Sequence, residues 1–406
     1  MSDDFDTSTI GSDRYTEVTT QSWFSRIAQS FVGLIVGPIL VLVGIGLLVW
    51  NESRAVTTAR SLAEGLGAVI SVETNAPLPQ NDGRLVHVSG PAAAGARLAD
   101  PDFHVSVTAL SLHRQVQMLQ WREREESHTE KNLGGSQTTV KTFSYTRDWS
   151  ASPIDSSHFR HPEGHANPGF IVPSRIIAAK DARIGGFHLA DKLLTTLPAD
   201  EVVGIDPAAV DGIKARLGRP VSAIDGTLFV GRDSGSPEIG DLKISFTDTP
   251  AGDITVIAAQ KGSVFAGYQT KAGDVLETIK LGLLTPKQIF AELESDNAVL
   301  TWILRAVGTL LVLVGFSVFF GPIAVLADVL PFLGDIVGFG TFFLAFMLTF
   351  IVVPVTIAVA WLAFRPLVSV AVLGVGLIGV LAVRFLWPAR RKPVPPPQPL
   401  FAPKQW

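Results

Sequence analysis

The stretch FVGLIVGPILVLVGIGLLVWNESRAVTTARSLAEG, residues 31–65, joins a purely apolar run to a polar collar. No charged residue occurs between residues 27 and 51. As a helix rising about 1.5 Å per residue, this window is long enough to cross a hydrocarbon core about 30 Å thick. The apolar run exceeds that of a cleaved signal peptide, and no Ala-x-Ala-like site precedes Glu52. The stretch therefore predicts a retained membrane anchor.

Three further uncharged windows, at residues 306–327, 336–364 and 366–383, are also long enough to cross a bilayer. Because lipid offers no hydrogen-bond partners, these runs must be helical there, and Pro38 and Pro354 indicate kinks. A chain with 47% hydrophobic and 17% charged residues is too apolar for one soluble body. We predict an integral membrane protein, α-helical with four spans, at residues 31–50, 303–327, 338–363 and 366–387.

Residues 51–300, between the first two spans, are numerous enough to form a core of their own. Residues 104–125 and 138–149 largely alternate between apolar and polar side chains and flank the turn NLGG, which predicts a long β-hairpin. We expect an α+β domain with a mostly antiparallel sheet. Its other predicted elements are strands at 84–90, 226–231, 241–248 and 253–260, and helices at 190–197, 207–218 and 285–302.

The two ends of the chain differ in composition from the rest. Residues 1–30 begin with a segment rich in Ser, Thr and Asp, which predicts a disordered cytoplasmic tail, and residues 388–406 form a basic, proline-rich tail. The cluster Arg390, Arg391 and Lys392 favours a cytoplasmic carboxyl terminus, since positive residues beside spans are retained on that side. With an even number of spans the amino terminus is cytoplasmic too. The domain at 51–300 is then extracytoplasmic.

The polar collar itself has the pattern of a short helix. Ala55, Ala59 and Leu62 share one face at 100° per residue, Arg60 and Glu64 form an i,i+4 pair, and Gly65 then ends the pattern. We interpret it as a helix that lies on the membrane surface or under the domain. A solvated linker is the alternative, because the apolar face is small.

The segment HFRHPEGH gathers His158, His161, Glu163 and His165 within eight residues, a composition from which a borderline cation such as zinc could be bound. Pro162 and Gly164 deny these side chains a common helical face, and the spacing matches no standard histidine ligand motif. We therefore interpret the His158/His161/His165 segment as a structural loop and predict no metal site.

A second short motif, GRDSGSP at 231–237, is similar to the sequence around the nucleophile of trypsin-like serine proteases. Arg232 replaces the expected glycine, and no suitably placed histidine accompanies it, so a surface turn is the better interpretation. Gly33 and Gly37 form a GxxxG pair that suits a close helix contact, either within one subunit or between two. Asp328 and Asp335 flank the loop between spans two and three and are expected to be solvated.

Six segments in the same order resemble the LUMA family of membrane proteins, over about residues 30–388. The resemblance implies four spans, a large lumenal or extracytoplasmic domain, self-association, and, in vertebrate members, partners such as lamins and emerin at the endoplasmic reticulum and inner nuclear membrane. It implies no catalytic residues. The chain departs from the family at Ser53, where glycine is usual, and in its proline-rich end. The six segments are NESRAVTTARSLAEG, VQMLQWREREE with KTFSYTRDW, GHANP at 164–168, EIGDLKISF, TWILRAVG and AWLAFRPL.

These features favour a multi-pass membrane scaffold or sensor whose domain binds itself, partner proteins or lipid. The alternative is a membrane enzyme or transporter acting on a lipid-derived or small polar substrate, but the spans lack strongly polar residues at their centres. We predict no catalytic residue, cofactor or nucleic-acid partner, since the net charge is -4 and no basic stripe is present. The expected membrane is the plasma membrane of a prokaryote, or the endoplasmic reticulum and inner nuclear membrane of a eukaryote.

Overall fold

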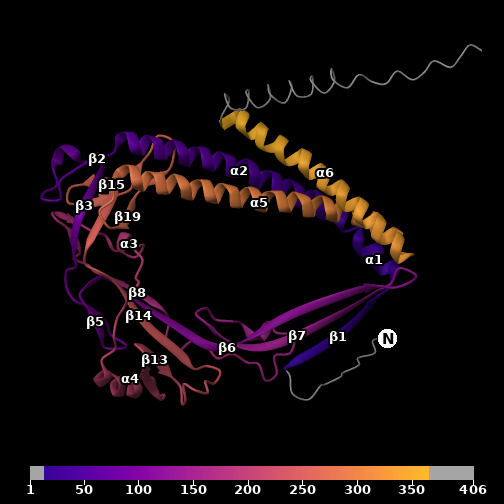
Figure 1. Cartoon of the computed structure of the whole chain (residues 1–406), viewed down its shortest axis with the longest axis horizontal. Coiled ribbons are helices and arrows are strands. Elements are labelled where there is room, and N and C mark those ends of the chain that lie inside the picture. Colours follow the sequence, from indigo (N-terminus) through magenta and orange to yellow (C-terminus); the bar gives the residue numbers. More distant parts are fainter. Residues whose placement is uncertain (1–12, 365–406) are drawn as a thin grey trace, which may run out of the picture.

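The computed structural model describes residues 13–364 as a three-sided frame (Figure 1). Helices α2 (Gly33–Ala68) and α5 (Pro286–Ala327) run antiparallel along one side. A ribbon of long strands forms the second side and a sheet domain closes the third. Helix α1 (Trp23–Ser30) lies at the corner where ribbon and helices meet, and α6 (Pro331–Phe364) runs back from that corner against α2 and α5.

Among residues 13–364, three helices are long and apolar enough to cross a membrane: Trp23–Ala68, Pro286–Ala327 and Phe332–Phe364. They contain the first three predicted spans, and Pro38 and Pro354 lie inside them as expected. The predicted fourth span at 366–387 and the tail at 388–406 lie outside the described residues.

Helices α2 and α5 approach closely because small residues face each other. A Cβ atom added to Gly37 would lie 2.6 Å from the carbonyl oxygen of Gly315, and one added to Gly33 would lie 2.4 Å from that of Val318. Such contacts let two helices pack backbone against backbone in lipid. The GxxxG pair is therefore used inside one subunit, which decides between the two alternatives that its sequence left open.

The domain contains two larger sheets, and their strands are mostly antiparallel, as predicted. The first has the order β1-β7-β6-β14-β13-β12, with β8 beside β6 and β11 beside β14. Its strands are β1 (Arg14–Gln21), β6 (Ala109–Lys131), β7 (Gln137–Ser150), β8 (Arg175–Ala178), β11 (Glu201–Val202), β12 (Val221–Ile224), β13 (Thr227–Val230) and β14 (Leu242–Pro250).

The second sheet has the order β19-β15-β16-β10-β9-β3-β2, with β15 also paired to β3. Buried side chains from both sheets, such as Leu112, Phe246, Phe187 and Val256, form one hydrophobic core. The strands are β2 (Ile70–Ser71), β3 (Leu85–Ala93), β9 (Arg183–Ile184), β10 (Phe187–His188), β15 (Asp253–Lys261), β16 (Val264–Ala266) and β19 (Thr278–Leu281); two small sheets add β4 (Leu98–Asp100), β5 (Val105–Val107), β17 (Tyr268–Gln269) and β18 (Val275–Leu276).

The short helices follow their sequence signals. Helix α3 (Asp191–Leu194) is shorter than the predicted 190–197. Before α4 (Val210–Leu217), Asp206 caps a 3-10 turn by accepting a hydrogen bond from the amide of Ala208, and Gly218 ends α4 in the left-handed conformation at φ 62°. Thr285 caps α5 in a capping box with Gln288.

The predicted hairpin is present and is longer than expected. Strands β6 and β7 stay paired from Met118↔Ser150 to Lys131↔Gln137, and the turn between them uses Gly134 and Gly135 at positive φ. Strand β1 then pairs with β7 along its whole length, from Arg14↔Ser144 to Gln21↔Gln137. The result is a three-stranded ribbon that projects from the domain toward α1 (Figure 1).

The expectation that residues 1–30 form a disordered tail is wrong for the part that the structure describes. Residues 14–21 form β1 and residues 23–30 form α1. The polar composition of this segment hid an edge strand, because such a strand is stabilised by backbone hydrogen bonds to β7 more than by buried apolar side chains. The pairing also joins residues 14–21 to the domain, although the predicted orientation places the two on opposite sides of the membrane.

The collar is not a separate surface helix. Helix α2 continues without a break from the apolar run through Glu52, Arg60 and Gly65 to Ala68. Arg60 and Glu64 also lack the predicted mutual contact: Arg60 donates to the carbonyl of Phe364, and Glu64 accepts from the amide of Lys271. The polar residues extend the membrane helix into the domain.

Candidate functional site: two polar clusters and a cavity

The first polar cluster lies where α2, α5 and α6 meet beside the domain. Glu52 is only 1% exposed, yet its carboxylate accepts hydrogen bonds from Arg305 Nε at 2.6 Å and Arg305 Nη2 at 3.0 Å. Trp361 Nε1 donates to the same carboxylate at 2.7 Å. The buried carboxylate of Glu52 on α2 thus binds one side chain from α5 and one from α6.

Neighbouring residues extend this cluster between α2 and α5. Arg54 donates to Asn297 Oδ1 at 3.0 Å and to Thr301 Oγ1 at 2.9 Å, and Asn51 Nδ2 donates to the Thr301 carbonyl at 3.1 Å. Asn51 is fully buried, so these bonds replace the water it has lost. The collar cluster is Asn51, Glu52, Arg54, Asn297, Thr301, Arg305 and Trp361.

The second polar cluster lies at the opposite end of α5, where the hairpin tip touches the helices. Arg26 Nη2 contacts Asp328 Oδ2 at 2.5 Å, and Lys131 Nζ contacts Asp328 Oδ1 and Asp335 Oδ1, both at 2.9 Å. Trp23 Nε1 donates to the Val325 carbonyl at 3.0 Å. The tip cluster is Trp23, Arg26, Lys131, Asp328 and Asp335.

Backbone contacts tighten the same junction. The amide of Gly134 donates to the Val329 carbonyl at 3.1 Å, and Arg26 Nη1 donates to the Gly135 carbonyl at 2.6 Å. A Cβ atom at Gly135 would lie 2.4 Å from the Trp23 ring, so only glycine fits there. Asp328 was expected to be a solvated loop residue, but it is 1% exposed. Its burial is made tolerable by two cations that come from distant segments.

The distance between the two clusters along α5 is close to the thickness of a membrane. Trp302, which is 67% exposed, and Arg305 mark the collar end of α5, with the guanidinium 4.8 Å from the Trp302 ring centre. Asp328 lies 23 residues beyond Arg305, which corresponds to about 35 Å of helix. Aromatic and charged residues favour the two faces of a bilayer, whose hydrocarbon core is about 30 Å thick. The clusters bound the apolar part of the helices on both sides.

A cavity of about 480 Å³ adjoins the collar cluster on its domain side. It lies between α2 and α5 on one side and residues of β15, β18 and β19 on the other. Its wall combines apolar side chains with an arginine and three carboxylates, a mixture typical of small-molecule sites. The lining residues are Arg54, Thr58, Leu62, Ile257, Asp274, Val275, Leu276, Glu277, Thr278, Phe290, Leu293, Asp296, Asn297 and Leu300.

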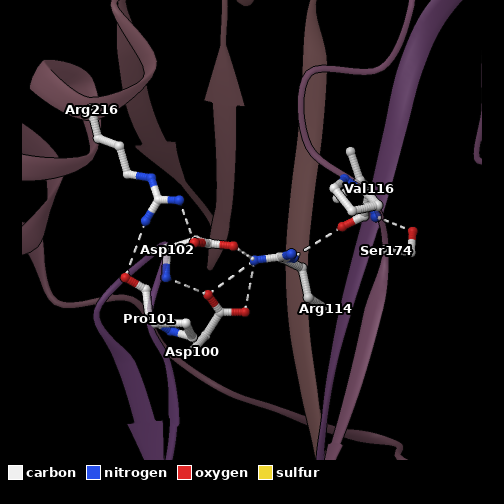
Figure 2. Close-up of polar contacts among 8 residues, drawn as sticks. Asp100, Pro101, Asp102, Arg114, Val116, Ser174 and Arg216 are labelled. Atoms are coloured by element: carbon white, nitrogen blue, oxygen red, sulfur yellow. Dashed lines mark hydrogen bonds and ion pairs between the residues drawn. The ribbon is translucent and has the colours of Figure 1, made fainter.

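A buried arginine holds together the remote part of the domain (Figure 2). Arg114 Nη1 contacts both carboxylate oxygens of Asp100 at 3.0 and 2.9 Å, and it contacts Asp102 at 2.8 Å. Its Nε donates to the Pro173 carbonyl, and Arg216 pairs with Asp102 from the other side. The charged groups of this centre pair with one another, and none of them lines the cavity or contacts the membrane-spanning helices, so we assign it a structural role.

The ion pair of Arg114 with Asp102 leads to a prediction of how the stability of the fold depends on pH. The hydrogen bond from Arg114 holds the pKa of Asp102 below its usual range, with partial burial acting in the opposite direction and Arg216 adding to the decrease. Because the pKa of Asp102 is lower in the folded state than its unfolded-state value of about 4, the ionised carboxylate stabilises the fold above that pH. This stabilisation is lost as the pH falls through the folded-state pKa. Asp102→Asn should therefore flatten the acid limb of thermal unfolding in detergent, whereas Asp233→Asn should leave it unchanged; equal acid limbs would contradict this assignment.

The histidine segment packs against the base of the ribbon. The rings of His161 and Tyr15 stack at 4.2 Å, and those of His165 and Tyr145 at 3.8 Å, while the side chain of His158 is 84% exposed. Within residues 13–364, no group of three or more His, Asp or Glu side chains is placed to hold a metal ion. Each of the two inner histidines instead fixes the loop to an aromatic side chain.

The protease-like segment at 231–237 is an exposed turn between β13 and β14. Asp233 accepts a hydrogen bond from the amide of Gly235, which closes the turn, and no histidine contacts Ser234 among the interactions of the described residues. The sequence did not single out Asn297, Thr301 or Trp361, which form part of the collar cluster. The polar collar that follows the first apolar run, with Glu52 near its start, indicated the position of the cluster.

These features define an integral membrane protein whose apolar helices continue into a sheet domain. The sequence profile of the family described as "Transmembrane protein 43" matches residues 118–366. The human protein of that name is 31% identical over 91% of this chain and 94% of its own length. The mouse protein is 30% identical over 95% and 98%, and the Drosophila melanogaster homolog 29% over 84% and 91%.

The chain therefore belongs to the transmembrane protein 43 family. The resemblance to the LUMA family, noted from six sequence segments, is confirmed by these matches. No solved structure matches the chain.

Proposed function

We propose that this protein is a self-associating membrane scaffold, in which α2, α5 and α6 cross the bilayer between the collar cluster and the tip cluster. The helices support a crossing arrangement because their exposed surface between the clusters is apolar on every side. A helix that lies in the membrane surface would need a polar face toward water. On this proposal the domain binds further copies, partner proteins or lipid.

We infer self-association from the path of the polar ribbon that β1, β6 and β7 form. Its outer half, residues 122–131 of β6, is exposed at nearly every position and extends about 33 Å. The apolar residues 31–50 of α2 extend about 30 Å as a helix. Because the tip cluster joins the far ends of both, we infer that the ribbon crosses the same thickness as the helices.

Direct contact with lipid would be unfavourable for this ribbon, because it carries many charged side chains. Each charge costs about 2.5–3.5 kcal/mol at the centre of a bilayer and less toward its faces, so seven charges along the ribbon would cost up to about 20 kcal/mol. Cross-strand pairs such as Lys141 with Glu125 reduce this cost, but the groups stay exposed. On this proposal other copies of the chain enclose the ribbon, so that its charges face water or each other. The seven residues are Arg122, Glu123, Arg124, Glu125, Glu126, Glu130 and Lys131.

Mass photometry in lipid nanodiscs tests this proposal. We expect dimers or larger assemblies of the full chain, with the ribbon protected from exchange with solvent more strongly in nanodiscs than in detergent that dissociates them. A chain that is only monomeric in nanodiscs, at concentrations where it remains folded, would overturn the proposal. The Glu73→Ala variant, at an exposed site away from helices and ribbon, serves as a matched control and should assemble normally.

A further inference from the structure

The cavity beside the collar cluster occupies a particular depth, on the proposal that the helices cross the membrane. Leu300, at one end of its wall, lies two residues from the interfacial Trp302. Phe290, at the other end, lies ten residues from Leu300, about 15 Å further from the membrane along α5. The cavity therefore extends from the level of lipid headgroups into the domain.

Some charged groups that line the cavity have hydrogen-bond or ion-pair partners, and others have none in the part of the chain that the structure describes. Arg54 Nη1 and Nη2 bond to Asn297 and Thr301, but Arg54 Nε is buried without a hydrogen-bond partner. Glu277 is paired with Lys192. Among the described residues, no ion pair occupies the carboxylates of Asp274 and Asp296. One cation with an unused donor thus faces the same cavity as two unpaired anions.

Much of the rest of the wall is apolar. Leu62, Ile257 and Phe290 belong to a small buried cluster, and Leu276 and Leu293 pack against it. A ligand that fits must therefore combine an anionic group for Arg54, a cationic group for the carboxylates and an apolar portion. A purely anionic headgroup would meet two carboxylates for each guanidinium, which disfavours it by like-charge repulsion.

We propose that this cavity binds the headgroup of a phospholipid that carries a primary amine, with the phosphate at Arg54 and the ammonium group at Asp274 and Asp296. The glycerol and the first part of an acyl chain contact Leu293 and Leu300 on the way to the bilayer. The occupant is a membrane lipid and not a soluble phosphoamine, because the apolar wall would otherwise face water.

Native mass spectrometry of the full chain tests this inference, with dioleoyl phosphatidylethanolamine, dioleoyl phosphatidylglycerol and soluble phosphoethanolamine as probes. We expect phosphatidylethanolamine to bind about 10-fold more tightly than phosphatidylglycerol, and phosphoethanolamine not to bind. Leu293→Trp, which fills the cavity and leaves Arg54 in place, should abolish the preference, and Asp274→Asn should reduce it. Arg60→Gln, outside the cavity, should bind as the parent does.

Equal binding of the two lipids, or a preference that survives Leu293→Trp, would overturn the inference. Binding of phosphoethanolamine without a lipid adduct would overturn the assignment to a lipid. The same spectra report the oligomeric state. Loss of lipid from an intact oligomer leaves the proposed scaffold standing, and a monomer that keeps the lipid preference refutes the scaffold alone.

Discussion

Glu52→Ala is expected to destabilise the protein by about 3–5 kcal/mol, the usual result of removing one partner from a buried ion pair. The substitution leaves the Arg305 guanidinium and the Trp361 N–H without their shared acceptor, and it disconnects α2, α5 and α6 at one point. Denaturant-induced unfolding in detergent, followed by tryptophan fluorescence, measures the change. Glu73→Ala, at an exposed position, should change stability by less than about 0.5 kcal/mol.

A double-mutant cycle separates the pair from its surroundings. If Glu52 and Arg305 interact directly, Glu52→Leu combined with Arg305→Met should be more stable than either single variant, because no charge is then left buried without a partner. A coupling free energy near zero would show that the two side chains do not form the contact on which the collar cluster rests.

Asp328→Ala is expected to release the hairpin tip from the helices. The carboxylate receives both Arg26 and Lys131, so its removal leaves two cations without their buried partner. Hydrogen exchange should become faster in residues 131–137 and in α1, while the core strands β14 and β15 keep their protection. The free energy for opening the tip and α1 should fall by about 3 kcal/mol.

Asp335→Ala is the matched control, because Asp335 binds the same lysine but its side chain is 71% exposed. An exposed ion pair contributes about 0–1 kcal/mol, so its removal should leave exchange at the tip nearly unchanged. Equal effects of the two substitutions would mean that Asp328 is not the buried centre of the tip cluster.

The local features of this fold could be predicted from the sequence, because they depend on neighbouring residues. Uncharged runs identified the first three apolar helices, alternation identified the hairpin, and Thr285 and Gly218 marked a helix start and a helix end. Each rule concerns a hydrogen-bonding or packing pattern that repeats within a few residues.

The polar clusters could not be predicted in this way. Glu52 and Arg305 are 253 residues apart in sequence, and Arg26 and Asp328 are 302 residues apart. No periodicity reports such a pairing, and a single charged residue beside a span is usually solvated. The same reason explains why β1 was missed: its partner, β7, is more than a hundred residues away, and its own side chains bury little apolar surface.

On the proposed arrangement, the hairpin tip and the body of the domain lie on opposite faces of the membrane. Because the chain contains no cysteine, single cysteines at Leu133, in the tip, and Ser234, in an exposed domain turn, can be labelled selectively. The reagent is a bulky, membrane-impermeant polyethylene glycol maleimide, applied to sealed vesicles of one orientation before and after permeabilisation. Our account predicts that one position is labelled before permeabilisation and the other only afterwards. Labelling of both positions from the same side would contradict it.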